Sequence, residues 1–382
     1  MGGPRADFLW SVATASAHLI LILSAPILGA LADHSGRKKR FLLATTIQTV
    51  IACALLALVG PGDVLAAMLI YTIGAVGFEG GYVFYNSFLR EVSTPRTISR
   101  ISGLSWGTGF LGGMTALVAC YPLLSRPLTD PGSGVLDPVA VSNYRLSFIV
   151  VAGFFALFSV PTFLFLRERG DPAPTGRLRD HATASLRRIR RTVRDLRQHR
   201  DAAKFVVAAM FFTAGVETVI KFSAIYASVT FGIQGTELVG LFVFANIVAV
   251  PGTLAAGWIA DRIGSRTILA WTLAAWFLLL IIGATSSSRA GIWILASGVA
   301  VAMGSTQAIG RSLMAVLSPP GRGAEFFGFY LLSSKLGAIL GLLVFGVVSW
   351  TTGSQRAALL AVAPSFLVAL LLVVAIERKT SA

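Results

Sequence analysis

Charged side chains within long apolar stretches are the residues of this 382-residue chain best placed to do chemistry. Glu79 lies in the apolar stretch 64–88, and Tyr82 and Asn86 follow it three and seven residues later, a spacing that places all three on one helical face. A charge inside a membrane span is costly unless it faces a bundle interior or a water-filled cavity. We expect Glu79 to face such a cavity, either as a proton carrier or as a hydrogen-bonding partner of a helix or substrate.

A second set of charges occurs in the later half of the chain. Glu217 and Lys221 are four residues apart in the stretch 203–231, so they form one patch near its middle. Lys335 lies in the middle of the stretch 325–350 and has no acidic neighbour in sequence. The Glu217–Lys221 patch has two interpretations, a substrate site or a buried structural ion pair, and a buried pair is weak evidence for stability.

Gln307 and Arg311 share one face of the stretch 290–316, with Arg311 near its end. Both halves of the chain therefore offer polar groups at similar depth. Carboxylates and ammonium groups in one cavity suit a zwitterion: a lysine would bind its carboxylate and a glutamate its ammonium group. Trp106 and other aromatic residues are interpreted as packing rather than as substrate contacts.

Composition defines the elements that carry these side chains. The chain is 55% hydrophobic and only 13% charged, with a mean hydropathy of +0.76, whereas a soluble domain has about 25% charged residues. It is therefore predicted to be an integral membrane protein. The net charge of +15 is concentrated in loops and one linker, which favours anionic lipid over nucleic acid as its neighbour. Cys53 and Cys120 fall inside apolar stretches and indicate no disulfide or metal site.

Eleven apolar stretches are long enough to cross a membrane as helices. They are predicted near 8–32, 41–60, 64–88, 101–124, 145–166, 203–231, 236–260, 267–285, 290–316, 325–350 and 355–377.

Arginine and lysine gather in every second loop between these stretches. The intervening loops 61–63, 232–235, 286–289 and 351–354 are nearly free of positive charge. Because positive loops stay in the cytoplasm, the linker and the C-terminus are predicted to be cytoplasmic. The residues that set this orientation are Arg37, Lys38, Lys39, Arg40, Arg90, Arg96, Arg100, Arg262, Arg266, Arg311, Arg322, Arg378 and Lys379.

Two loops share one design and reveal an internal repeat. The sequence GALADHSGRKKR (29–40) returns as GWIADRIGSR (257–266), so that Asp261 follows Asp33 by 228 positions. Repetition at this distance is typical of a duplicated transporter. Five stretches precede the linker and six follow it, so the first half is predicted to lack an opening helix.

The two loops are predicted to form a conformational latch. Their glycines allow close helix approach, and each aspartate can accept hydrogen bonds from the N-terminus of a facing helix. Arg37 and Arg266 are expected to pair with the aspartates; the alternative is topological charge alone. The predicted latch residues are Gly29, Asp33, Gly36, Arg37, Gly257, Asp261, Arg262 and Arg266.

The linker divides the chain into an N-terminal bundle (1–166), a cytoplasmic linker (167–202) and a C-terminal bundle (203–382). Within the linker, helical spacing of Leu186, Ile189, Val193 and Leu196 among arginines predicts a basic amphipathic helix on the membrane face. It is interpreted as a charged tether or as a lipid or protein docking site.

The first repeated loop matches G-x-L-A-D-x-x-G-R-K-K, and by this motif the chain resembles the major facilitator superfamily. The stretches 84–113 and 318–356 are similar to the unknown-major-facilitator family, whose eukaryotic relatives are autophagy-linked vacuolar amino-acid effluxers. The resemblance implies an all-α fold of two pseudo-symmetric helical bundles. It also implies secondary active transport of a small polar solute, with amino-acid efflux by alternating access.

Two other functions stay open: export of a more apolar or drug-like solute, and a non-transporting sensor on the same fold. An enzyme is not predicted, because the chain contains no Ser-His-Asp set, HExxH motif or phosphate loop. No cofactor or metal is expected. The expected partners are a small-molecule solute, with or without proton coupling, and the lipid bilayer. The expected state is a monomer in a bacterial cytoplasmic membrane.

Overall fold

The computed structural model describes residues 4–60, 62–126, 128, 135–168, 199–233, 235–286 and 288–377, which are almost entirely helical. Eleven of the helices in these ranges are long and apolar enough to cross a membrane, as the sequence predicts. The predicted amphipathic helix of the linker lies outside the described residues.

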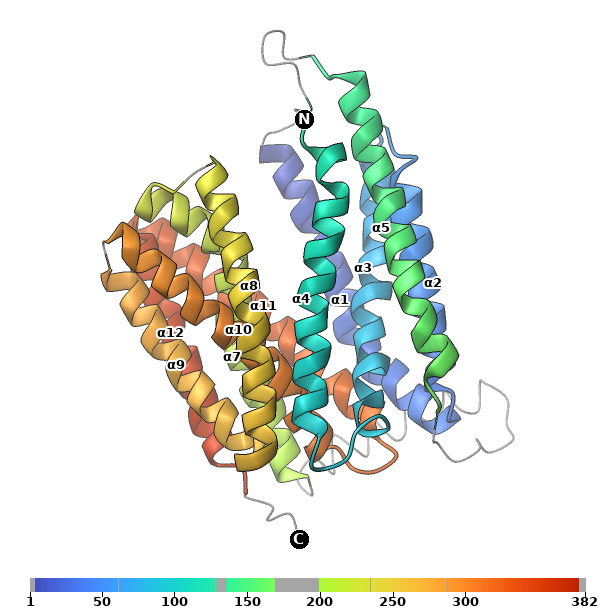
Figure 1. The fold of residues 1–382 in the computed structure, drawn as a ribbon, viewed down its shortest axis with the longest axis vertical. Helices are drawn as coiled ribbons and strands as arrows, with labels where there is room; N and C mark the ends of the chain where they lie inside the picture. Colours follow the sequence, from blue (N-terminus) through green and yellow to red (C-terminus); the bar gives the residue numbers. More distant parts are fainter. Residues whose placement is uncertain are drawn as a thin grey trace.

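The helices form two bundles that lie side by side (Figure 1). The first bundle, blue to green, contains α1 (Pro4–Ser35), α2 (Lys38–Leu56), α3 (Val64–Ser87), the short 3₁₀ helix η1 (Phe88–Arg90), α4 (Ile98–Leu124) and α5 (Pro138–Phe165). The second bundle, yellow-green to red, contains α7 (Arg200–Phe231), α8 (Gly235–Ile263), α9 (Ser265–Thr285), α10 (Arg289–Leu317), α11 (Gly323–Thr352) and α12 (Gln355–Val374).

Local signals explain where several helices begin and end. The Asp137 carboxylate accepts a hydrogen bond from the Val139 backbone N–H at 2.9 Å, and Pro138 opens α5 in the position where its missing N–H costs nothing. Gly232 and Gly353 end α7 and α11 with φ values of 67° and 64°, a left-handed conformation that glycine adopts without strain.

The second bundle has the more closely packed core. Trp276 of α9 stacks on Phe366 of α12 with ring centroids 5.1 Å apart. Its indole nitrogen also donates to the Thr306 hydroxyl at 2.9 Å. In α7, 56% of the membrane-spanning residues are buried, against 6% in α5. Helix α7 therefore has much less of its surface left uncovered than α5.

One cause of this difference is the surroundings of α11 and α4. In the second bundle α7 packs against the glycines of α11, whereas in the first bundle no described helix packs against the corresponding glycines of α4. A Cβ added to Gly337 of α11 would overlap the backbone of Met210 in α7. A Cβ added to Gly109 or Gly113 of α4 would meet no atom within 4 Å. Gly109 and Gly113 therefore have no packing neighbour at their Cβ positions among the described residues.

The bundles meet most extensively where α1 packs on α11 and α4 on α8, and α10 and α11 of the second bundle also contact α4 and α3 of the first. Both of the extensive contacts depend on glycine. A Cβ at Gly257 of α8 would lie 2.6 Å from the Ser99 carbonyl oxygen of α4, and a Cβ at Gly328 of α11 would lie 2.6 Å from the Ala25 carbonyl oxygen of α1. The backbones therefore touch directly, as the small residues at these positions permit.

Candidate functional site

A cavity of about 300 Å³ lies between the two bundles. Its walls come from α3 and α4 of the first bundle and from α7, α10 and α11 of the second. Seven of the eight side chains that the sequence singled out for a site line this one cavity: Glu79, Tyr82, Asn86, Glu217, Gln307, Arg311 and Lys335.

An ion pair crosses the cavity from one bundle to the other. The Lys335 ammonium nitrogen of α11 lies 2.5 Å from a carboxylate oxygen of Glu79 on α3. The lysine side chain is 11% exposed and the glutamate 28%. Lys335 has no acid nearby in sequence, and its partner lies 256 positions away. The pair therefore ties the two halves of the repeat together at mid-span.

Glu217 and Lys221 occupy different surroundings, although both lie on α7. The cavity wall includes Thr213, Glu217 and Ile220, whereas Lys221 is exposed and outside the cavity. Among the described residues no ion pair joins Glu217 to Lys221 or to another cation. The interpretation of the two as a structural ion pair is therefore wrong, because their helix turns Lys221 past the edge of the cavity.

Arg311 of α10 is a buried cation that contacts the first bundle. Its guanidinium donates to the Ser102 hydroxyl at 3.0 Å, to the Ser102 carbonyl oxygen at 3.4 Å and to the Asn86 amide oxygen at 3.3 Å. It also lies over the Tyr85 ring, 5.3 Å from the centroid. Only 5% of the residue is exposed. All of these partners are uncharged.

His18 of α1 lies near the charged residues of the site, and sequence reasoning missed it. It is half-buried and lies within electrostatic range of Lys335, Glu79 and Lys221. A single histidine in an apolar stretch is usually a packing residue, so its type alone gave no signal. Its position 15 residues before Asp33 on the same helix would have placed it at the depth of the other charges.

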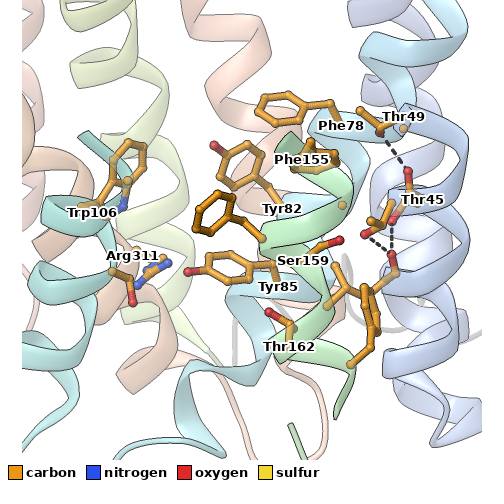
Figure 2. A pocket seen from close by; sticks show the side chains of 18 of the residues that line it. Thr45, Thr49, Phe78, Tyr82, Tyr85, Trp106, Phe155, Ser159, Thr162 and Arg311 are labelled. Carbon is orange, nitrogen blue, oxygen red and sulfur yellow. Dashed lines mark hydrogen bonds between the residues drawn. The ribbon is translucent and has the colours of Figure 1, made fainter. Parts of the chain in front are cut away.

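A second, more aromatic pocket of about 420 Å³ lies within the first bundle (Figure 2). It shares Phe78, Tyr82, Trp106 and Arg311 with the central cavity. Its remaining wall is formed by aromatic residues and by hydroxyl groups of α2, α4 and α5. The two spaces therefore meet at a common boundary. Trp106, which was expected to be a packing residue, lines both of them.

The bundles are joined at the ends of α1 and α8, which we call the latch end. The Asp261 carboxylate accepts hydrogen bonds from the backbone N–H groups of Ser99 at 2.8 Å and Arg100 at 3.0 Å, in the first turn of α4. The Asp33 carboxylate accepts one from the Glu325 N–H at 2.8 Å, in the first turn of α11. Both aspartates thus occupy the anion position at a helix N-terminus.

The predicted latch glycines also lie at these contacts. Gly257 packs on Ser99, and a Cβ at Gly29 would overlap the Ala324 carbonyl. Gly36 has a φ of 60°, a left-handed conformation that requires glycine between α1 and α2.

Among the described residues, neither Arg37 nor Arg266 forms the predicted ion pair with a latch aspartate. Arg37 is exposed, and Lys38 instead lies 4.0 Å from Asp33 while it pairs with Glu91 at 2.5 Å. Arg266 binds the carbonyl ends of α12, donating to Val373 O at 3.1 Å and to Val374 O.

Arg262 stacks on Trp258, 3.5 Å from the ring centroid. The two basic residues that follow Asp261 in sequence therefore have other partners. Arg262 stacks on the Trp258 ring, and Arg266 donates to the carbonyl end of α12.

Two helical bundles around a charged cavity form the fold of the major facilitator superfamily. The fucose:proton symporter FucP of E. coli aligns with a TM-score of 0.71 at 16% identity, over 97% of each chain. The proton:xylose symporter XylE aligns with a TM-score of 0.70 at 14% identity, over 97% of this chain and 86% of the other. At such identities the likeness establishes the fold.

The sequence narrows the assignment further. Residues 8–92 and 89–382 match the family model described as "Vacuole effluxer Atg22 like", and the chain belongs to this family. The uncharacterized MFS-type transporter YxiO of Bacillus subtilis (strain 168) is 29% identical over 95% of this chain and 83% of its own length. Autophagy-related protein 22 of Coccidioides immitis (strain RS) is 23% identical over 89% of this chain and 66% of its own length. The protein is therefore a multi-pass membrane transporter and not an enzyme.

Proposed function

We propose that this transporter exports an amino acid as a secondary transporter that works by alternating access. The observation that carries the proposal is the central cavity, in which two carboxylates and two cations from both bundles surround a space of about 300 Å³. A zwitterion has one group for each sign of charge. Membership of the effluxer family supports the direction of transport.

The charges divide naturally between the two ends of a zwitterion. Glu217 has no ion-pair partner among the described residues, so it is the carboxylate available to a substrate ammonium group. Lys335 is held by Glu79. A substrate that binds either member must break this tie between the bundles, and the tie forms again when the cavity empties. Substrate binding is thereby coupled to the contact between the two halves.

The latch end supports the alternating-access part of the proposal. Its contacts hold α1 against α11 and α4 against α8, and breaking them frees that end to open. Because the positive loops lie at this end, we assign it to the cytoplasm, so the structure is closed on the cytoplasmic side. The proposal includes a monomer in a bacterial cytoplasmic membrane, with bundles at 1–166 and 203–382, a cytoplasmic linker at 167–202 and a cytoplasmic C-terminus.

No nucleotide-binding motif occurs in the sequence, so an ion or substrate gradient would drive transport. Proton coupling would act through Glu79. Protonation of its carboxylate would break the ion pair with Lys335 that joins the bundles, and loss of the proton would restore it.

A second candidate is export of a more apolar or drug-like solute. The aromatic pocket favours it, because Phe78, Tyr82, Tyr85 and Phe155 offer ring surfaces next to the cavity. A non-transporting sensor is disfavoured, since the cavity charges and both aspartate contacts are present.

Release of labelled amino acids from preloaded proteoliposomes tests the proposal. Each amino acid is measured separately, with and without a pH gradient. Saturable release of one chemical group of amino acids supports the proposal, and acceleration by the gradient supports proton coupling. Release of apolar amines or dyes in place of any amino acid would establish the second candidate instead.

A further inference from the structure

Arg311 is a buried charge with no counter-ion among the described residues. Its three hydrogen bonds go to neutral oxygen atoms of Ser102 and Asn86. A guanidinium has five N–H groups, so two of them have no acceptor in these contacts. A buried charge left without an opposite charge is strongly unfavourable. The surroundings of Arg311 therefore favour an anion in the cavity that it faces.

Trp106 supplies a second donor to the same space. Its indole nitrogen is buried and has no hydrogen-bond partner among the described residues. The indole of Trp276, which belongs to the packed core, donates to Thr306 at 2.9 Å. Buried donors without an acceptor are rare in native proteins. An acceptor provided by a ligand would satisfy the N–H of Trp106.

The two groups lie at one boundary. Trp106 on α4 and Arg311 on α10 both line the central cavity and the aromatic pocket, and Figure 2 shows them at one side of the pocket, next to Tyr82 and Tyr85 and across from Thr45 and Thr49. Both can donate hydrogen bonds and neither can accept them. Their ligand must therefore be an acceptor, and the positive charge selects one that is negative.

We propose that Arg311 and Trp106 form a subsite for the oxyanion of the transported solute, which for an amino acid is its carboxylate. That the ligand is the transported solute rests on the proposed function, whereas the oxyanion chemistry rests on the two donors themselves. Arg311 supplies charge and a forked donor, and Trp106 supplies one directional N–H. Ser102 and Asn86 hold the guanidinium in place. Lys335 is already neutralised by Glu79, and its role is the ion pair that joins the two bundles.

The test uses the full chain in nanodiscs with 5-fluorotryptophan in place of its seven tryptophans. The ¹⁹F signal of Trp106 is identified by its loss in Trp106→Phe. The probes are phenylacetate, its neutral isostere phenylacetamide and the cation phenethylamine. Phenylacetate is expected to move the Trp106 signal saturably, and the other two are expected to bind at least tenfold more weakly.

Variants then separate the two donors. Loss of one hydrogen bond to a charged group corresponds to an approximately 10- to 150-fold loss of affinity, so Trp106→Phe should raise the phenylacetate Kd by a factor in this range. The matched control is Trp271→Phe, at a position that is 62% exposed, and it should leave the Kd unchanged. Arg311→Gln should abolish binding, and Arg311→Lys, which keeps the charge, should restore part of it.

Equal affinity for phenylacetate and phenylacetamide in the folded protein would overturn the proposal, as would an unchanged Kd in Trp106→Phe. If phenylacetate binds as expected while no amino acid is released from proteoliposomes, the oxyanion subsite stands and the amino-acid assignment fails.

Discussion

Replacement of Asp261 by asparagine should shift the conformational equilibrium at the latch end. The carboxylate accepts two hydrogen bonds, from Ser99 and Arg100, in the first turn of α4. Asparagine keeps one acceptor oxygen and loses the charge. A hydrogen bond to a charged group contributes about 1.5–3 kcal/mol, and an anion at a helix N-terminus contributes about 0.3–1 kcal/mol. We expect a loss of about 2–3 kcal/mol, or an approximately 30- to 150-fold shift towards the open latch end.

Electron–electron double resonance in nanodiscs measures this shift. Spin labels are placed at Arg96→Cys, before α4, and Ile263→Cys, at the end of α8, since both positions are exposed and lie on different bundles. Cys53 and Cys120 are first replaced by alanine. In Asp261→Asn a longer-distance population should appear at the expense of the short one.

Two further variants control the experiment. Asp33→Asn should give a shift of the same sign, because Asp33 accepts a hydrogen bond from Glu325 at the start of α11. Asp63→Asn should give none, because Asp63 is exposed and bonds only its local turn at Gly60. Unchanged distances in folded Asp261→Asn, or an equal change in Asp63→Asn, would refute the assignment of the latch.

Two other predictions concern stability. Lys335→Met leaves the Glu79 carboxylate without its partner and should cost about 3 kcal/mol in thermal unfolding; the double variant with Glu79→Gln should recover much of that loss, and additive losses would contradict a direct pair. Gly257→Ala places a Cβ 2.6 Å from the Ser99 carbonyl oxygen and should cost about 1–3 kcal/mol by overpacking, whereas Gly153→Ala, with nothing within 4 Å, should be neutral in the same assay.

The fold could be predicted from the sequence because its signals are local and repeated. Runs of about 20 apolar residues define spans whatever their packing, and the repeated loops around Asp33 and Asp261 define two related halves. The hydrogen bonds of these aspartates to helix N-termini follow from the same physics. The depth of a charge within its span likewise indicated that Glu79 and Arg311 would face a common cavity.

The partners of these side chains could not be predicted, since they depend on how the bundles pack. Glu79 and Lys335 meet only when α3 faces α11 across 256 positions of sequence. Arg266 follows Asp261 in the chain but binds α12, because α9 and α12 pack together. Lys221 shares a helix with Glu217 and still lies outside the cavity.

The central claim is that the charges lining the cavity bind the transported solute. Release of labelled amino acids from proteoliposomes with Glu217→Gln and with Lys221→Gln tests it most directly, because only Glu217 lines the cavity although the two residues are one helical turn apart. Saturable release is expected from the wild type and from Lys221→Gln, and loss of release from a folded Glu217→Gln protein. Wild-type release rates in Glu217→Gln, or no release of any amino acid by the folded wild type, would contradict the claim.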